Sequence, residues 1–131
     1  MVIDTSALVA IIIGEDERAI FEDLILRTPV AVMSVVSMVE SSIVMLNKRP
    51  SYQFKELEET ISWLRIDIRA VDLNQGALAR EAFLHYGRGR GPAGLNFGDC
   101  FAYALARARD DALLFKGDDF QQTDIVAAWR P

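Results

Sequence analysis

Short apolar segments alternate with amphipathic helical segments along the whole chain, and this alternation limits the possible folds more than any other feature. Four segments read as buried strands: Met1–Asp4, Val30–Met33, Ile68–Leu73 and Ala112–Phe115. A candidate fifth strand, Ile125–Ala128, follows near the end of the sequence. Strands separated by helices form parallel sheets, because the crossover helices cover the faces of the sheet. The sequence therefore predicts an α/β fold, a three-layer α/β/α sandwich with a parallel four- to five-stranded sheet.

Six segments between these strands carry the signals of helices, and Gly14 and Pro29 mark the ends of two of them. The expected helices are Thr5 or Ser6 to Ile13, Asp16–Arg27, Ser34 to Lys48, Gln53–Leu64, Gln75–Tyr86 and Asn96 to Arg109. A glycine-rich loop, Gly87–Gly94, separates the last two helices. The 131 residues are enough for one domain, residues 1–131, with a sizeable core.

The composition narrows the class of protein. The single cysteine, Cys100, excludes an internal disulfide and fits a reducing cytoplasm. No apolar run approaches the roughly 18 residues of a membrane-spanning helix, so we expect a cytoplasmic protein without a membrane partner. A net charge of −5 argues against broad, non-specific binding of nucleic acids. It does not exclude a nuclease, because acids gathered at a metal site contribute much of such a charge.

Three acidic residues, Asp4, Glu40 and Asp99, stand alone in apolar stretches. An unpaired carboxylate in an apolar setting is unfavourable by several kcal/mol, so such groups are normally paired or bound to a metal. No lysine or arginine lies nearby in the sequence to pair with any of them. We therefore expect the fold to bring the three together around a divalent cation. Oxygen ligands of this kind select Mg²⁺ or Mn²⁺ over zinc.

Each of these acids also has a purely structural explanation. Asp4 ends the first strand, at the edge where open α/β sheets place their sites, but it can instead cap the following helix. Glu40 falls on the apolar face of its helix, or completes a capping box with Ser37 if the helix starts late. Asp99 lies in a first helical turn, where a carboxylate interacts favourably with the helix dipole. Taken together, three isolated acids on separate elements favour a shared site.

Four motifs occur in order along the chain. They are Val2-Ile3-Asp4-Thr5-Ser6-Ala7-Leu8, Glu40 after a serine-rich helix start, Leu95–Phe101 around Asp99, and Leu113–Phe120 followed by Thr123-Asp124-Ile125. Together they resemble the motifs of PIN-domain ribonucleases, and more closely those of the VapC toxins of prokaryotic toxin–antitoxin pairs. The resemblance implies a nuclease that binds Mg²⁺ or Mn²⁺ to cut RNA. It also implies that Asp4 and Asp99 are the principal metal ligands, supported by Glu40.

The chain departs from the family pattern at the end of the last long strand. Many PIN domains carry an aspartate two positions after a threonine there, where this chain has Phe115 and Gly117. The fourth acid is therefore displaced to Asp118 or Asp119, and the spacing alone does not decide between them. Asp119 is the slightly better match, because the family pattern has an Asp-Phe pair at this point.

The hypothesis that follows is metal-assisted hydrolysis of phosphodiester bonds, in which Glu40 or the fourth acid orients the attacking water. Arg88 and Arg90, in the glycine-rich loop, are suited to clamping phosphates unless that loop is simply solvated. Lys116 can meet a phosphate or merely balance charge. Ser6 can touch the metal shell, although capping its helix is the simpler role.

Other classes of protein fit the sequence less well. A phosphoacceptor receiver domain needs adjacent acids near the end of the first strand, where Asp4 is single. A haloacid-dehalogenase-type phosphatase needs Asp-x-Asp, where this chain has Asp4-Thr5-Ser6. A non-enzymatic module whose acids grip a basic partner would lack turnover. The resemblance further implies a small VapB-like antitoxin as partner, and a homodimer formed through helix Val35–Leu46 or Asp16–Arg27.

Overall fold

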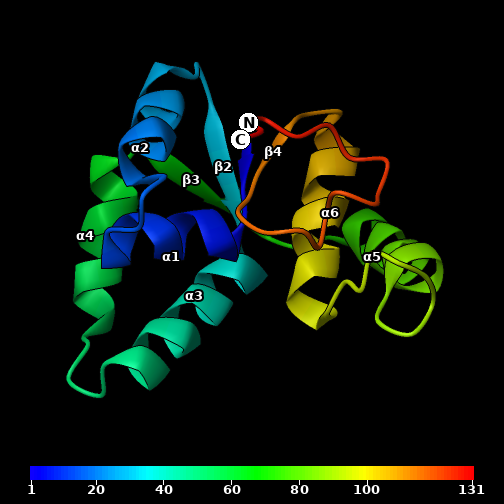
Figure 1. Ribbon diagram of the computed structural model, residues 1–131, viewed down its shortest axis with the longest axis horizontal. Coiled ribbons are helices and arrows are strands. Elements are labelled where there is room, and N and C mark those ends of the chain that lie inside the picture. Colours follow the sequence, from blue (N-terminus) through cyan, green and yellow to red (C-terminus); the bar gives the residue numbers. More distant parts are fainter.

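A parallel sheet of four strands lies at the centre of the protein, in the order β3-β2-β1-β4 (Figure 1). The computed structural model describes residues 1–131. The strands are β1 (Val2–Ile3), β2 (Ala31–Ser34), β3 (Ile66–Arg69) and β4 (Leu113–Leu114). All three pairs of neighbouring strands are parallel, as the alternation of strands and helices predicts.

Six helices surround this sheet, and most of them lie on its two sides (Figure 1). They are α1 (Thr5–Ile13), α2 (Arg18–Arg27), α3 (Val35–Lys48), α4 (Phe54–Trp63), α5 (Leu73–Tyr86) and α6 (Phe97–Arg109). Successive strand residues point to opposite faces, so Ile3 and Leu114 pack among α1, α2 and α4, whereas Val2 and Leu113 pack against α6. The predicted α/β/α sandwich is confirmed. None of the helices is both long enough and apolar enough to cross a membrane.

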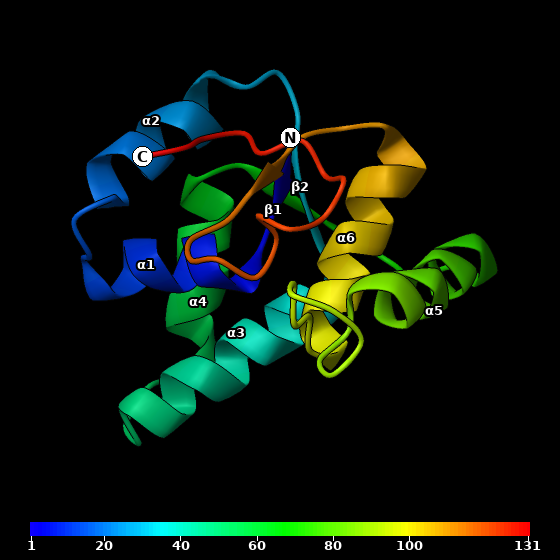
Figure 2. The ribbon, with the colours of Figure 1, turned by 45° about the vertical axis from the view of Figure 1, so that its right-hand side comes forward.

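Three helices begin at the carboxyl edge of the sheet. β1 and β2 run almost directly into α1 and α3, and the first turn of α6 reaches the same region (Figures 1 and 2). Helix α3 packs against both α1 and α6 there. In open α/β sheets, binding and catalytic sites lie outside the carboxyl ends of the strands. The fold therefore gathers the starts of three helices at the edge where a site is expected.

The third strand lies earlier in the chain than the predicted Ile68–Leu73. β3 pairs with β2 from Ile66 to Arg69 and then ends. The side chain of Asp72 accepts a hydrogen bond from the backbone N–H of Gln75 at 2.8 Å, which caps α5 and starts that helix at once. Because this N-cap residue lies within the apolar segment, the strand ends before it, and the predicted C-terminal end of the strand is wrong.

The candidate fifth strand, Ile125–Ala128, does not extend the sheet by a full strand. It makes a single parallel bridge between Leu113 and Ala127. Two hydrogen bonds hold it, from the N–H of Leu113 to the carbonyl of Val126 at 2.9 Å and from the N–H of Ala128 to the carbonyl of Leu113 at 2.8 Å. The C-terminal segment thus covers the free edge of β4, and the sheet has four strands.

Leu8→Ala is expected to lower the free energy of unfolding by about 3 kcal/mol, because Leu8 is fully buried between the sheet and its helices and its truncation leaves a cavity. Leu73→Ala is the matched control. Leu73 is 94% exposed, so its truncation should change the free energy of unfolding by no more than about 0.5 kcal/mol. Chemical denaturation followed by circular dichroism measures both values, and equal losses in the two variants would contradict this core.

Candidate functional site

Asp4 links the central strand to α1 and presents one carboxylate oxygen without a partner. Its backbone N–H donates to the carbonyl of Leu114 at 2.9 Å, which ties it to β4. Its Oδ2 accepts hydrogen bonds from the N–H of Ser6 at 2.9 Å and from the hydroxyl of Ser6 at 2.5 Å. Its Oδ1 is buried and accepts no hydrogen bond. Because a buried oxygen without a partner is unfavourable, Oδ1 is a natural ligand for a cation.

Ser6 connects Asp4 to the segment that follows β4. While its hydroxyl donates to Asp4, its Oγ accepts a hydrogen bond from the backbone N–H of Lys116 at 2.9 Å. The prediction that Thr5 or Ser6 caps α1 is wrong, because Asp4 is the N-cap residue and receives the N–H of Ser6. Ser6 therefore orients the Asp4 carboxylate through its hydrogen bonds to Oδ2.

Asp99 lies in the first turn of α6, where it completes a capping box with Asn96. Its Oδ2 accepts a hydrogen bond from the N–H of Asn96 at 2.9 Å, and its own N–H donates to Oδ1 of Asn96 at 2.8 Å. The side chain is buried, with Asp99 only 7% exposed. The structural and the functional explanations of Asp99 are thus compatible, since the capping box holds the carboxylate at the edge of the sheet.

Glu40 reaches this edge from α3. Its carboxylate lies against the backbone of Gly98, directly before Asp99, and neither a hydrogen bond nor an ion pair with another protein group involves it. The alternative in which Ser37 and Glu40 form a capping box is wrong. Helix α3 begins one turn earlier, where Ser34 is the N-cap and accepts a hydrogen bond from the N–H of Val36 at 3.2 Å. Glu40 is therefore available for another role.

The acids influence one another's ionisation. Burial raises the pKa of Asp4 to about 6, and the neighbouring charge of Glu40 adds to this shift. Burial raises the pKa of Asp99 to about 7, with further increases from the charges of Asp4, Asp119 and Glu40. The four carboxylates thus share one electrostatic environment, in which desolvation and like charges favour the protonated forms of Asp4 and Asp99.

The two candidates for the fourth acid differ in their surroundings. Asp119 is exposed and close enough to raise the pKa of Asp99. Asp118 is exposed too, but its Oδ1 accepts a hydrogen bond from Nε2 of Gln121 at 2.9 Å within the turn that follows. The structure brings Asp119 toward the other acids and gives Asp118 a local role in the turn.

The carboxylates do not form a closed cage of protein ligands, but they can hold a divalent cation that keeps part of its water shell. No group of three or more Asp, Glu, His or Cys side chains is arranged to enclose a metal ion by itself. Mg²⁺ usually keeps several waters and binds through only one or two protein carboxylates. The unpartnered Oδ1 of Asp4, together with the nearby carboxylate of Asp99, fits this requirement.

The basic candidates lie around this site and not within it. Lys116 pairs its ammonium with Glu15 and with Glu17, the latter at 2.9 Å. Its hydrogen bond to Glu17 holds the pKa of that carboxyl below its usual range, and the two acids raise the pKa of Lys116. Arg88 and Arg90 are exposed and make no ion pair.

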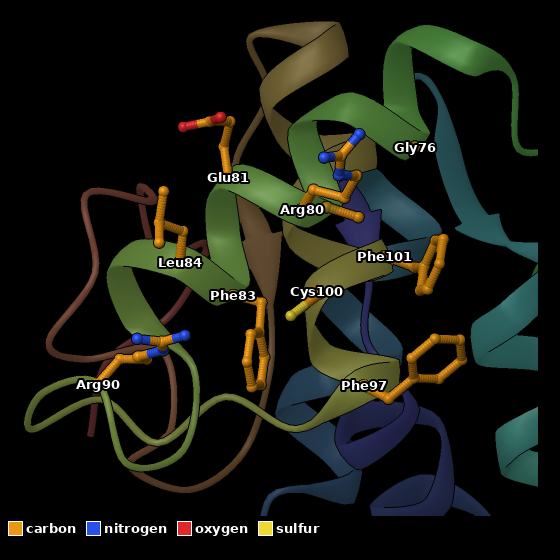
Figure 3. Close-up of a pocket in the computed structure, with 10 residues that line it drawn as sticks. Gly76, Arg80, Glu81, Phe83, Leu84, Arg90, Phe97, Cys100 and Phe101 are labelled. Atoms are coloured by element: carbon orange, nitrogen blue, oxygen red, sulfur yellow. The ribbon is translucent and has the colours of Figure 1, made fainter.

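Arg90 lines a groove of about 580 Å³ between α5 and α6 (Figure 3). Phe83 enters this groove from α5, and Phe97 and Phe101 stand together on the α6 side with ring centroids 5.0 Å apart. The groove begins at Phe97, two residues before Asp99. The glycine-rich loop, through Arg90, therefore borders an apolar surface that starts beside the acids.

Sequence reasoning missed Gly98, on which the Glu40 carboxylate rests. One signal was present, since glycine is disfavoured inside helices and this one stands directly before a buried acid. The contact itself joins two residues that are distant in the sequence, and no local pattern reveals it.

The metal-free protein is expected to lose stability as the pH rises from about 4 to about 8. Asp4 and Asp99 have folded-state pKa values of about 6 and about 7, above the ordinary 3.8, so the folded state binds protons more tightly than the unfolded state in this range. Asp99→Asn should make the free energy of unfolding depend less on pH. At pH 8 the free energy of unfolding of this variant should exceed that of the wild type by about 2 kcal/mol. Urea denaturation in EDTA at several pH values measures this, and a parallel profile in the variant would contradict it.

Comparison with known proteins shows the family to which this chain belongs. The family model described as PIN domain matches residues 1–126. Ribonuclease VapC of Mycolicibacterium smegmatis is 43% identical over 127 residues, covering 97% of this chain and 98% of that protein. Ribonuclease VapC30 of Mycobacterium tuberculosis is 41% identical over 131 residues, covering 100% of both chains.

The fold also matches a solved structure. VapC20 of Mycobacterium tuberculosis, described as a Sarcin-Ricin loop cleaving toxin, superposes with a TM-score of 0.72. The match covers 99% of this chain and 98% of that one, at 18% sequence identity, so it supports the fold alone. From the family model and the full-length relatives together, the chain belongs to the PIN-domain family and, within it, to the VapC ribonucleases, the toxins of toxin–antitoxin systems.

Proposed function

We propose that this VapC ribonuclease cleaves RNA at the cluster formed by Asp4, Glu40, Asp99 and Asp119, with Mg²⁺ or Mn²⁺ as its metal. The observation that carries the proposal is the buried Oδ1 of Asp4, which has no partner although its carboxylate interacts electrostatically with those of Glu40 and Asp99. Such an arrangement is unfavourable in the free protein and becomes favourable when a cation is bound.

Each carboxylate has a distinct role in this proposal. Asp4 and Asp99 hold the ion, since both are buried and each is fixed by helix-capping hydrogen bonds. A bound divalent ion supplies a water of lowered pKa and neutralises charge on the phosphate. Glu40 makes no hydrogen bond to the protein, so its carboxylate is free to orient the attacking water or to accept its proton. Asp119, at the exposed rim, is the alternative carboxylate for orienting this water.

The proposed substrate contacts come from the loop between α5 and α6. Arg88 and Arg90 are exposed and form no ion pair, so their guanidinium groups are free to bind phosphates on either side of the cleaved bond. Ser6 and Lys116 belong to the supporting structure, because both are engaged by other protein groups. We propose that the activity takes place in the cytoplasm, where cellular RNA is found.

Asp99→Asn should lower the cleavage rate by about a hundredfold or more, because it removes a charged metal ligand. Antitoxin-free protein is incubated with total tRNA and rRNA in Mg²⁺, in Mn²⁺ and in EDTA, and the products are separated on denaturing gels. Discrete products are expected with either metal and none in EDTA. Cleavage that persists in EDTA, or in the folded Asp99→Asn variant, would contradict the proposed site.

Asp119 and Asp118 provide a matched pair of neighbouring, exposed acids for the same assay. Asp119→Asn should slow cleavage by about tenfold or more, because this carboxylate lies within electrostatic reach of Asp99. Asp118→Asn should cleave like the wild type, since Asp118 is bound within its own turn. The opposite result would assign the role of the fourth acid to Asp118.

A different outcome bears on the class of protein. Folded wild-type protein that binds Mn²⁺ but never cleaves RNA would favour an acidic partner-binding module.

We propose two protein partners as well. A VapB-like antitoxin would cover the acidic site with a basic side chain, because an arginine neutralises the same carboxylates that a metal ion does. A second copy of the chain would pack on the outer face of α3. Val39, Ile43 and Leu46 lie on this face, spaced at helical intervals, and are 49%, 53% and 39% exposed.

Ile43→Lys is expected to shift the protein from dimer to monomer at micromolar concentration, because it places a charge at the centre of this apolar face. Ile20→Lys is the control on α2, where Ile20 is similarly exposed at 47%. Analytical ultracentrifugation measures both masses. A wild-type mass of one chain would refute the dimer, and a monomeric Ile20→Lys beside a dimeric Ile43→Lys would move the interface to α2.

A further inference from the structure

Gly98 occupies a helical position that its backbone does not explain. It is the second residue of α6 and is buried. Its φ is not positive, unlike those of Gly14, Gly89 and Gly117, so any residue can adopt this conformation. Glycine is a poor helix former, and alanine would normally be the better residue there. The reason for glycine must therefore lie in what surrounds the missing side chain.

The space that a side chain at Gly98 would fill is taken by the carboxylate of Glu40. A Cβ atom at Gly98 would lie 2.1 Å from Oε2, 2.5 Å from Cδ and 2.7 Å from Oε1 of Glu40. These distances are far below van der Waals contact. In contrast, a Cβ at Gly76, the other helical glycine, would have no heavy atom within 4 Å. The close approach is therefore specific to Gly98.

This approach places the Glu40 charge among the other acids. Glu40 comes from α3, whereas Asp99 is the neighbour of Gly98 on α6. The carboxylate of Glu40 acts electrostatically on both Asp4 and Asp99. Since Glu40 accepts no hydrogen bond from the protein, only the shape of its surroundings keeps its flexible side chain there.

We propose that Gly98 is a positioning residue, whose missing side chain provides the space in which the Glu40 carboxylate lies beside Asp99. The catalytic consequence rests on the proposed nuclease function, while the structural consequence does not. The atoms that would clash with a methyl group at position 98 form the end of a flexible side chain, not backbone. Gly98→Ala should therefore keep α6 folded and displace Glu40 from the acids.

The test compares Gly98→Ala, Glu40→Ala and the double variant with Gly76→Ala, which makes the same substitution in open helical space. Cleavage of the tRNA and rRNA pool, Mn²⁺ affinity by calorimetry and a crystal structure of Gly98→Ala are measured. Gly98→Ala should slow cleavage by about tenfold or more, as mutations of supporting residues do at metal sites. The double variant should be no slower than Glu40→Ala, because both changes remove the same group. Gly76→Ala should behave like the wild type.

Several outcomes overturn the proposal. It is wrong if Gly98→Ala cleaves like Gly76→Ala, if the two losses multiply in the double variant, or if Glu40 keeps its place in the crystal structure. If Gly98→Ala does not fold, the double variant, which lacks the clashing carboxylate, must recover folding. If the wild type itself does not cleave, the proposed function fails, while the position of Glu40 in the Gly98→Ala crystal still decides the role of Gly98.

Discussion

The parallel pairing of β1 with β2 and β4 is the constraint on which the site depends. Val2 lies opposite both Val32 and Leu113, so the carboxyl ends of the three strands reach one edge together. Asp4 follows β1 at this edge, and its N–H is bound to the carbonyl of Leu114. The helix that carries Glu40 starts from the same edge, and so does the segment that leads to Asp119. A shift of one residue in either pairing would separate these acids and exchange the buried faces of the strands.

Asp4 and Asp99 combine helix capping with the metal binding that we propose for them. Asp4 caps α1 and Asp99 completes the capping box of α6, in each case with its Oδ2. The hydrogen bonds to the helix ends fix the direction of each carboxylate, and in Asp4 they leave the second oxygen without a partner. Helix formation thus orients acids whose ionised forms are disfavoured by burial and by their mutual repulsion. The same hydrogen bonds therefore stabilise the starts of the two helices and direct the two carboxylates.

Much of this arrangement can be predicted from the sequence, because strand alternation and isolated acids are local signals. Asp4, Glu40 and Asp99 stand out in their apolar stretches, and the parallel sheet explains why such acids meet. The third strand was misplaced because Asp72, inside an apolar segment, starts a helix. The role of Gly98 depends on a side chain from a distant helix, and the pairing of Lys116 with Glu15 and Glu17 is equally non-local. Contacts between residues that are distant in the sequence produce no local sequence pattern from which they could be predicted.

The anchoring of Lys116 extends the site beyond the residues that touch it. Its N–H is bound by Ser6 at the start of α1, and its ammonium by Glu15 and Glu17 beyond the other end of that helix. The segment leading to Asp119 is therefore attached at two points to the N-terminal part of the chain. The first of these points, Ser6, lies 110 residues before Lys116 in the sequence. Through this attachment, α1 and the residues that follow it hold in place the segment between Lys116 and Asp119. A loss of charge at Glu15 or Glu17, both partly exposed, would remove one of the two acids that hold the Lys116 ammonium and leave the four acids of the proposed site unchanged.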